Sequence, residues 1–426
     1  MRSRNALLVV VALFAGFSAF GSGFALYEPS VISHAMGGAL VGKAMDASAN
    51  FNNPATLTDL TNIWVTVGFV TEHPRGSVSV GRNGGPKIDE TMDPGFFMLP
   101  HFQLAVPLPW GFAFGLGGSA DYGLGTQYGD NWMMDWNSTE TDVQGYVLNP
   151  NLAFKIGDFS IAGGLRWLYF DFEQYKRPQA PYPTPNGVID AGGFGYHLKG
   201  DNRFESMGWQ VGAKYDILDN LSVGAVYKSA IDVDVRGDTD MSVRSVNVPA
   251  AGQALAASAL QHTGSAEADL RLPQSVTMGL NWDVVKTWHL GTAVSWTQWS
   301  DFDQLIFDVK PEPMPVELAW RDTWRASVGS CWDFWEGWKW MVSYAYDMDC
   351  TTDEQASTML PPANRHILAT GLVWNIWRGF DLAVSYSCIF MHGGDMHTTD
   401  ALGNRYDLET CWGFCHAAGA SITYRF

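Results

Sequence analysis

Residues 23–60 read GFALYEPSVISHAMGGALVGKAMDASANFNNPATLTDL and differ in composition from everything that follows them. The stretch is rich in Gly, Ala and Ser and shows no alternation of apolar and polar residues, so it predicts neither a strand nor a long helix. It ends in Asn53, Pro54 and Ala55, where Asn favours a turn and Pro lacks the N–H group that a strand ladder requires. The triplet alone is equally consistent with a simple turn before the first strand, so its meaning depends on its surroundings.

The residues before this stretch predict export from the cytoplasm. Arg2 and Arg4 precede an apolar run that ends at Phe20, and small residues follow, which is the pattern of a secretory signal peptide. We assign residues 1–21 to this peptide and expect cleavage near Ala19–Gly21. The remaining chain has 24 basic residues, because two of the 26 are removed, against 44 acidic ones, a formal charge of −20 that argues against nucleic acid as a partner.

The composition predicts a membrane protein built from strands. Charged residues make up 16% of the chain, below the roughly 25% of soluble domains, whereas Gly (45) and Trp (19) are abundant. Mean hydropathy is near zero, and no window after residue 21 contains ~18 consecutive apolar residues, which excludes a helical membrane protein. A transmembrane β-barrel combines modest hydropathy with many aromatic residues, because only alternate residues face lipid.

From residue 61 to the C-terminus, about fourteen candidate strands are joined by connections that alternate in length. This alternation is typical of an up-and-down outer-membrane barrel, with short periplasmic turns and long external loops. Trp or Phe flanks several short connections, as expected for an aromatic girdle at the membrane interface. The expected short connections are 107–111, 156–159, 216–220, 282–288, 332–338 and 375–379, and the expected long ones are 75–95, 123–141, 172–203, 237–268, 301–317, 347–364 and 391–410.

Single strands show the same pattern in their side chains. Apolar residues alternate with small or polar ones along residues 289–296, and again along residues 420–426. The terminal Phe426 is similar to the C-terminal signal by which the barrel-assembly machinery recognises outer-membrane proteins. A soluble β-sandwich would also alternate within one strand, but it does not explain the signal peptide, the connection lengths and the terminal Phe together. In the last strand we expect Ala420, Ile422, Tyr424 and Phe426 to face outward and Ser421, Thr423 and Arg425 to face inward.

In this order the features resemble the FadL family, outer-membrane channels for long-chain fatty acids and related hydrocarbons. The similar segments are Leu272–Ser275 (LPQS), Trp296–Leu305 (WTQWSDFDQL), Trp320–Gly329 (WRDTWRASVG), Pro361–Gly371 (PPANRHILATG) and Met391–Gly393 (MHG). The resemblance implies an all-β fold, a transmembrane antiparallel β-barrel of about 14 strands. Residues 61–426 would form the barrel, and residues 22–60 would form an N-terminal hatch that plugs its lumen.

The resemblance also implies a gate. In the family, a kink in the third strand opens a lateral gap beside the Asn-Pro-Ala turn, here Asn53, Pro54 and Ala55. Glycines near the kink would ease it, although glycine would equally make room for the hatch inside the lumen. The segment that matches the kink consists of Ala120, Asp121, Tyr122, Gly123 and Leu124, and we take the first four as candidate gate residues.

Candidate substrate contacts come from two places. The first residues of the hatch, Phe24, Leu26 and Tyr27, would line an apolar pocket. Lys176, with Arg177 beside it, falls where the family has a basic residue that meets the substrate carboxylate; a solvated loop charge is the alternative. The fifth loop, with Lys310 and several prolines, offers no clear second basic partner. The fourth loop carries an Ala-rich stretch at residues 250–260 that favours a short helix, either a ligand groove or a plain lid.

From the resemblance we expect passive outer-membrane transport of hydrophobic substrates, first of all long-chain fatty acids. Substrate would be captured by the loops, rearrange the hatch and leave sideways at the kink. A channel for aromatic hydrocarbons or another lipid is the alternative within the family. The expected partners are the hydrophobic molecule, outer-membrane lipid and lipopolysaccharide of a Gram-negative bacterium, and the assembly machinery through Phe426. We expect a monomer without cofactor or enzymatic activity.

Other classes of protein remain as alternatives. A hydrolase needs Ser and His together, but His289 and Ser295 are ~20 Å apart along one strand and no Gly-x-Ser-x-Gly motif occurs. An adhesive barrel would need no plug. His392, Asp395 and His397 have metal-binding side chains, but the resemblance already accounts for the first, so no metal site is predicted. The five cysteines allow a disulfide, although buried or lipid-facing thiols are favoured.

Overall fold

The computed structural model describes residues 23–129, 132–179, 181–190, 193–245, 263–302, 304–309, 314–317, 320–352 and 357–426. The expected signal peptide, the Ala-rich stretch at 250–260 and Lys310 of the fifth loop lie outside these residues. Within them, no helix is both long enough and apolar enough to span a membrane.

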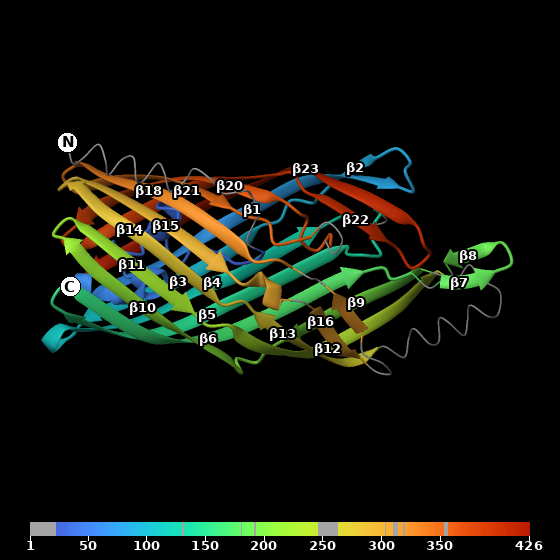
Figure 1. Ribbon diagram of the computed structural model, residues 1–426, viewed down its shortest axis with the longest axis horizontal. Helices are drawn as coiled ribbons and strands as arrows, with labels where there is room; N and C mark the ends of the chain where they lie inside the picture. The colour runs from blue at the N-terminus through green and yellow to red at the C-terminus, as the bar shows by residue number, and fades with distance from the viewer. Residues whose placement is uncertain are drawn as a thin grey trace.

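Fourteen antiparallel strands close into a barrel (Figure 1). The first strand, β1, pairs with the last, β23, from Trp64 opposite Arg425 to Arg82 opposite Tyr406, which closes the sheet on itself. The prediction of an all-β barrel of about 14 strands is therefore confirmed. The barrel strands are β1 (Trp64–Arg82), β3 (Phe97–Pro107), β4 (Phe112–Gln127), β5 (Glu140–Ile156), β6 (Phe159–Lys176), β10 (Ser206–Leu218), β11 (Leu221–Lys228), β14 (Ser275–Val285), β15 (Trp288–Thr297), β18 (Thr323–Trp335), β19 (Trp338–Asp347), β20 (Asn364–Trp377), β21 (Phe380–His392) and β23 (Arg405–Arg425).

The six predicted short connections all fall between successive barrel strands, although the strands extend further into them than expected. The predicted long connections contain additional strands that continue the barrel wall or form hairpins beyond it. Figure 1 shows β2, β22 and the β7–β8 hairpin at the end of the barrel opposite to the C-terminus. These additional strands are β2 (Ile88–Thr91), β7 (Pro181–Thr184), β8 (Gly187–Asp190), β9 (Gly193–Asp201), β12 (Ile231–Ser245), β13 (Gly264–Leu272), β16 (Gln304–Val309), β17 (Met314–Glu317) and β22 (Asp395–Thr399).

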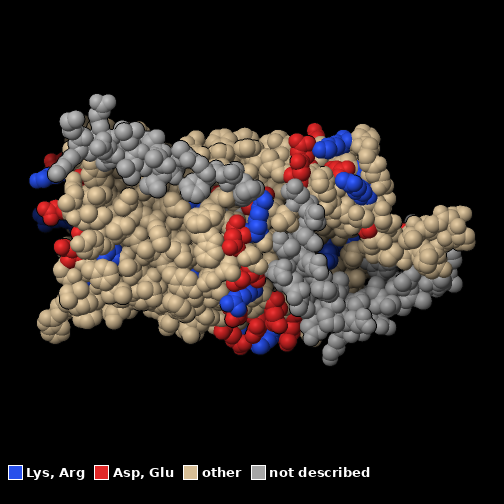
Figure 2. Space-filling model, in the orientation of Figure 1, with Lys and Arg blue, Asp and Glu red and all other residues tan. Residues whose placement is uncertain are grey.

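The outward face of the barrel is apolar. In the last strand Ser421 and Thr423 are buried whereas Ile422 is 54% exposed, so the predicted alternation is confirmed there. Trp335 and Trp377, at two short turns, are more than half exposed, which suits side chains at a membrane interface. Figure 2 shows a broad face with few charged residues, between charges at the short-turn end and a charged band toward the long loops.

Residues 23–60, called the N-terminal segment below, contain three short helices. These are α2 (Val31–Ala35), α3 (Ala49–Asn52) and the 3₁₀ helix η1 (Pro54–Asp59). Its side chains are largely buried against inward-facing residues of the barrel. One apolar cluster joins Val31, Ile32 and Met36 to barrel residues that include Met341 of β19 and Val373 of β20. The segment is therefore packed against inward-facing residues of the barrel wall.

Candidate functional site

The wall of the barrel is irregular at β4. Ala120 is opposite Tyr146 of β5 and Tyr122 is opposite Gly145, so Asp121 between them has no partner and forms a β-bulge. The predicted kink at residues 120–123 coincides with this bulge.

The β4 strand separates from β3 next to the bulge. Pairing between the two strands covers only the ladder from Phe102 opposite Gly118 to Pro107 opposite Ala113. β3 nevertheless continues to pair with β1 on its other side, as far as Phe97 opposite Glu72. Beyond Gly118, the facing edges of β3 and β4 thus lack the ladder that joins other neighbouring strands.

The N-terminal segment occupies part of the freed edge of β4. Ala25 forms an antiparallel bridge with Tyr122. The N–H of Leu26 donates to the carbonyl oxygen of Asp121 at 2.9 Å, and the N–H of Gly123 donates to that of Phe24 at 2.9 Å. The predicted gate strand and the predicted substrate-contacting residues are therefore neighbours.

The Asp121 side chain is held by two cations that the sequence did not suggest. Arg166 of β6 donates from Nη2 to Asp121 at 3.0 Å and from Nη1 to the Ser229 carbonyl oxygen at 3.2 Å. The Nζ of Lys228, on β11, lies 3.6 Å from the same carboxylate. The bulge is thereby tied to two other strands through groups that are mostly buried.

The Asn-Pro-Ala triplet caps η1 and contacts β10. Asn53 accepts from the Ala55 N–H at 3.1 Å and donates from Nδ2 to the carbonyl oxygens of Val41 (2.7 Å) and Ala213 (2.9 Å). Among the described residues, no hydrogen bond joins the triplet to residues 120–123. Phe51, two residues before the triplet, lies near the same cations: its ring centroid is 5.9 Å from the Nζ of Lys228, which is itself 3.6 Å from the Asp121 carboxylate.

A cavity of about 330 Å³ lies between the N-terminal segment and the separated strands. Leu26, Tyr27, Ala120, Tyr122 and Gly123 line it, so five of the predicted site residues surround one space. Both faces of β3 contribute to the lining, including Met98 on the outward face, and Phe96 lines the cavity just before the strand; both are more than half exposed. The cavity therefore reaches the outer face of the barrel at the break between β3 and β4.

Phe24 lies beside the cavity without lining it. Its ring is packed edge-on among Tyr122, Trp299, Phe302 and Trp320, at centroid distances of 4.9 to 6.0 Å. Phe24 is 3% exposed. This aromatic cluster packs Phe24 against β4 and against the connection between β15 and β18.

The cavity also contains charged residues that the sequence did not single out. Arg365 donates from Nη2 to the Gly23 carbonyl oxygen at 2.7 Å, and its Nη1 lies 3.9 Å from Asp347. Glu28 and Glu72 line the same space. Burial raises the pKa of the Glu28 carboxyl above its usual value, although nearby Arg325 and the Tyr27 N–H counteract this. Of these charged residues, only Arg365 lies in a segment that the sequence analysis had marked as similar to the family, PPANRHILATG.

Lys176 and Arg177 are placed away from the cavity lining. The Nζ of Lys176 lies 5.0 Å from the centroid of the Tyr196 ring, and no carboxylate partner is found for it among the described residues. Arg177 donates from Nη1 to the Asp135 carboxylate at 3.3 Å. The structure thus does not bring these two residues together with Leu26 and Tyr27.

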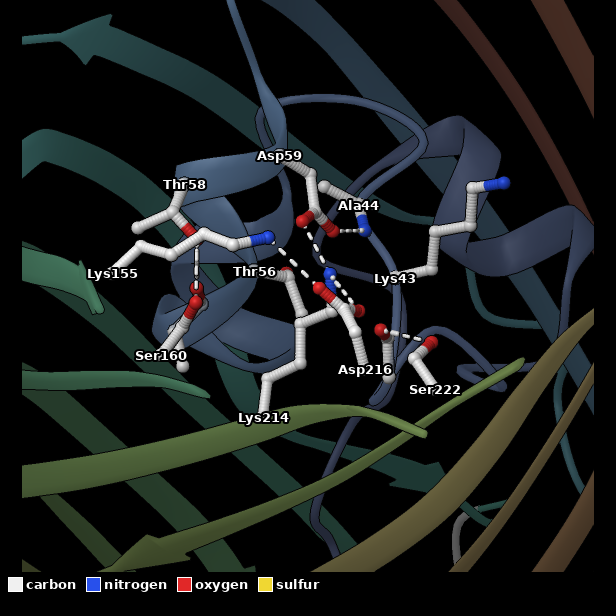
Figure 3. Close-up of polar contacts among 12 residues, drawn as sticks. Lys43, Ala44, Thr56, Thr58, Asp59, Lys155, Ser160, Lys214, Asp216 and Ser222 are labelled. Atoms are coloured by element: carbon white, nitrogen blue, oxygen red, sulfur yellow. Dashed lines mark hydrogen bonds and ion pairs between the residues drawn. The ribbon is translucent and has the colours of Figure 1, made fainter. Parts of the chain in front are cut away.

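A polar cluster ties the N-terminal segment to the wall at the short-turn end of the barrel (Figure 3). Lys214 of β10 lies between Asp59 of η1 and Asp216, and Lys155 of β5 donates to Asp216 at 2.8 Å. Thr58 is 2.9 Å from the Ser160 hydroxyl of β6. The sequence gave no signal for these contacts, which depend on the register of strands far apart in the chain.

Within the described residues, the side chains considered for a metal site or a hydrolase site do not come together. Within the described residues no group of three His, Cys, Asp or Glu is placed to hold a metal; His392 lies 3.2 Å from His366, and His397 binds Asp407. His289 contacts Asp283, whereas Ser295 contacts Thr277, so no Ser–His pair forms there. All five cysteines are free thiols.

Comparisons with known proteins agree on one family. The family model described as "Outer membrane protein transport protein (OMPP1/FadL/TodX)" matches residues 11–426. A long-chain fatty acid transport protein of Escherichia coli O6:H1 is 25% identical over 457 aligned positions, covering 100% of this chain and 98% of the relative.

Two solved structures share the fold. A FadL homologue of Pseudomonas aeruginosa has a TM-score of 0.83 at 20% identity, covering 95% of this chain and 100% of its own. The toluene transporter TodX of P. putida has a TM-score of 0.66 at 15% identity, covering 96% and 99%. At these identities the structures are similar to this chain in fold alone.

Proposed function

The chain belongs to the OMPP1/FadL/TodX family of outer membrane transport proteins, and on that premise we propose that a hydrophobic molecule enters its cavity, displaces the N-terminal segment and leaves sideways between β3 and β4. Family membership makes the protein an outer-membrane transporter of hydrophobic substrates and not an enzyme. Entry into the cavity, displacement of the N-terminal segment and lateral exit are our proposal. The observation that carries it is the cavity whose lining includes Met98 on the outward face of β3, beside the point where the β3–β4 ladder stops.

The N-terminal segment acts in this proposal as a hatch that plugs the lumen. An open barrel of about 14 strands would leak water and small solutes, whereas an apolar substrate needs no aqueous pore. Leu26 and Tyr27 line the cavity and Phe24 is anchored beside it, so in this proposal a ligand that outgrows the cavity displaces residues 24–27. Because Leu26 and Phe24 are hydrogen-bonded to the β4 edge, their displacement frees that edge.

Long-chain fatty acids are the first candidate substrate, since the E. coli relative that aligns over the whole chain is a long-chain fatty acid transport protein. Aromatic hydrocarbons are the second candidate, because the TodX fold is shared. We assign Lys176 and Arg177 to an earlier step, capture at the loops, since neither lines the cavity. No energy source is needed beyond the concentration gradient.

The barrel would work as a monomer in the outer membrane of a Gram-negative bacterium, surrounded by lipid and lipopolysaccharide. Its apolar outer face and its exposed tryptophans support this setting. Phe426, which is 66% exposed, remains accessible as the proposed signal for the barrel-assembly machinery.

The route through the wall is tested by narrowing it. Ala120 is 4% exposed and lines the cavity beside the bulge, so Ala120→Trp should obstruct passage between β3 and β4. Uptake of radiolabelled oleate and of toluene is measured in cells that lack their own transporters, with wild type and the variant at equal outer-membrane levels. We expect uptake with wild type and its loss with Ala120→Trp. Equal uptake by both proteins would exclude the lateral route.

A further inference from the structure

We infer that a patch of histidines on the outward face of the barrel binds a phosphate group of lipid A, the phosphorylated lipid of lipopolysaccharide. The histidine patch consists of His73 and Arg75 of β1, His366 of β20, His392 of β21 and His416 of β23. The inference uses the outer-membrane setting of the proposed function but neither the cavity nor the lateral route, so it adds an interaction surface that transport does not require.

The histidine patch is on the lipid-facing side of the wall. His416 is exposed between the buried Cys415 and Ala417. On β20, His366 shares its face with Leu368, which is 52% exposed, because side chains alternate along a strand. These histidines therefore point away from the packed interior.

Side chains of neighbouring strands meet on this face. His73 is directly opposite His416 in the β1–β23 ladder, and Arg75 is opposite Phe414. Arg75 is thus the diagonal neighbour of His416, at a separation that a long side chain spans. Since β20, β21, β23 and β1 are adjacent in the wall, the patch extends across four neighbouring strands.

Two tyrosines hold the histidines by hydrogen bonds. The Tyr344 hydroxyl lies 2.8 Å from Nδ1 of His366, whose Nε2 lies 3.2 Å from Nε2 of His392. The Tyr386 hydroxyl lies 2.7 Å from Nδ1 of His416. We assign each hydroxyl as the donor, since a neutral imidazole has one accepting nitrogen. The ring protons are then on the far nitrogens, which leaves Nδ1–H of His392 and Nε2–H of His416 as donors without a partner among the described residues.

The histidine patch lies at the outer edge of the apolar band. Eleven residues of β20 separate His366 from Trp377 at the short turn. At ~3.3 Å per residue and a tilt of about 40°, this is ~28 Å of height, whereas the apolar band of a membrane barrel is ~25 Å tall. His366 therefore reaches the level at which hydrocarbon gives way to head groups in the outer leaflet.

Carboxylates do not neutralise the histidine patch. Glu72 of β1 lies on the inward face and lines the cavity. The next outward carboxylate along β23 is that of Glu409, which pairs with Lys87 at 2.9 Å. Arg75 forms no ion pair with any residue that the structure describes. The guanidinium and the ring N–H groups are therefore available to an external anion.

Outward histidine and lysine side chains have the opposite surroundings on β6 and β9. Glu173 there is contacted by His197 at 2.8 Å and by Lys199 at 2.9 Å. Asp171 and Asp201 are directly opposite each other on the same face. The donors on that side are already paired and are surrounded by an excess of acidic groups, which would repel a phosphate.

Lipid A fits the histidine patch in chemistry and in position. Each of its phosphates has several acceptor oxygens, which match one guanidinium and two imidazole N–H groups. The patch lies at the long-loop end of the strands, where lipopolysaccharide forms the outer leaflet, whereas the phosphates of periplasmic-leaflet phospholipids are at the level of the short turns. The expected partner is therefore lipid A and not a phospholipid.

Lipid A and the same molecule with both phosphates removed test the inference. Binding to the full-length mature protein in detergent is measured by native mass spectrometry, with EDTA present so that no divalent cation bridges protein and phosphate. The proteins are wild type and the double variants His392→Phe/His416→Phe and Tyr344→Phe/Tyr386→Phe. His197→Phe is the matched control, because His197 is an outward histidine that is bound to Glu173. Heat-modifiable migration on gels verifies that each barrel is folded.

We expect wild type and His197→Phe to bind lipid A about tenfold more tightly than its dephosphorylated form. His392→Phe/His416→Phe should abolish this preference, and Tyr344→Phe/Tyr386→Phe should reduce it about threefold, because the ring protons are no longer fixed. Equal affinity of wild type for both forms, or a preference that persists in both double variants, would overturn the inference. Displacement of lipid A from wild type by an equimolar amount of phosphatidylglycerol would assign the patch to phospholipids and would also overturn it.

Discussion

The carboxylate of Asp121 lies 3.0 Å from Nη2 of Arg166, and this ion pair joins the bulge of β4 to the wall strand β6. The two side chains are only 7% and 3% exposed. The backbone carbonyl oxygen of the same Asp121 accepts from Leu26 in the N-terminal segment. One residue therefore couples the N-terminal segment, the end of the β3–β4 ladder and β6, the second strand along the wall from β4.

Asp121→Asn should loosen the bulge. Removing one partner of a buried ion pair typically costs about 3–5 kcal/mol, because the other charge is left uncompensated. We expect a lower melting temperature in detergent and a faster influx of small solutes into proteoliposomes. Asp232→Asn serves as the control, since the Asp232 side chain is 79% exposed, and it should change neither quantity. Unaltered melting and influx in Asp121→Asn would show that the pair does not hold the bulge.

Lys214→Gln should release the other end of the N-terminal segment. Lys214 is the cation shared by Asp59 and Asp216 and is 5% exposed, so its loss leaves two carboxylates close together. We expect faster amide hydrogen exchange in η1 and in residues 42–46, with little change in residues 24–27. Faster exchange along the whole segment would instead mean that it unfolds as one unit.

The barrel was predictable from the sequence because each strand separates two different environments, and this difference determines which residues alternate along the strand. Lipid outside and packed side chains inside impose a period of two, so Ile422 and Thr423 could be assigned to opposite faces from the pattern alone. The contacts of Arg166 with Asp121 and of Arg365 with Gly23 were not predictable. They join residues 45 and 342 positions apart, and they depend on the register of several strand pairs, which a local pattern does not specify.

Acid should loosen the packing of α2. Burial lowers the pKa of His34 to about 4 from 6.5, while its two ring nitrogens contact the hydroxyls of Ser385 and Ser387 at 2.9 and 2.8 Å. The packed state favours the neutral ring, so its stabilisation is present above pH 6.5 and is lost as the pH falls toward 4. The total change is up to about 3 kcal/mol. Hydrogen exchange of residues 31–36, corrected for intrinsic rates, should accelerate over this range in wild type but not in His34→Gln. An equal response of both proteins would assign the effect to another group.

Gly291→Ala should open the barrel without disturbing its wall. A Cβ atom at Gly291 of β15 would lie 2.0 Å from the Ala39 carbonyl oxygen, so the methyl group and the N-terminal segment exclude each other there. The barrel strand is held by ladders on both sides and the segment by scattered contacts, so we expect the segment to move. Gly163→Ala is the matched control, because the nearest atom to its Cβ would be 3.9 Å away. Single-channel conductance in planar bilayers should rise for Gly291→Ala and stay at the wild-type level for Gly163→Ala. Equal conductance in all three proteins would mean that close packing at this point does not keep the lumen closed.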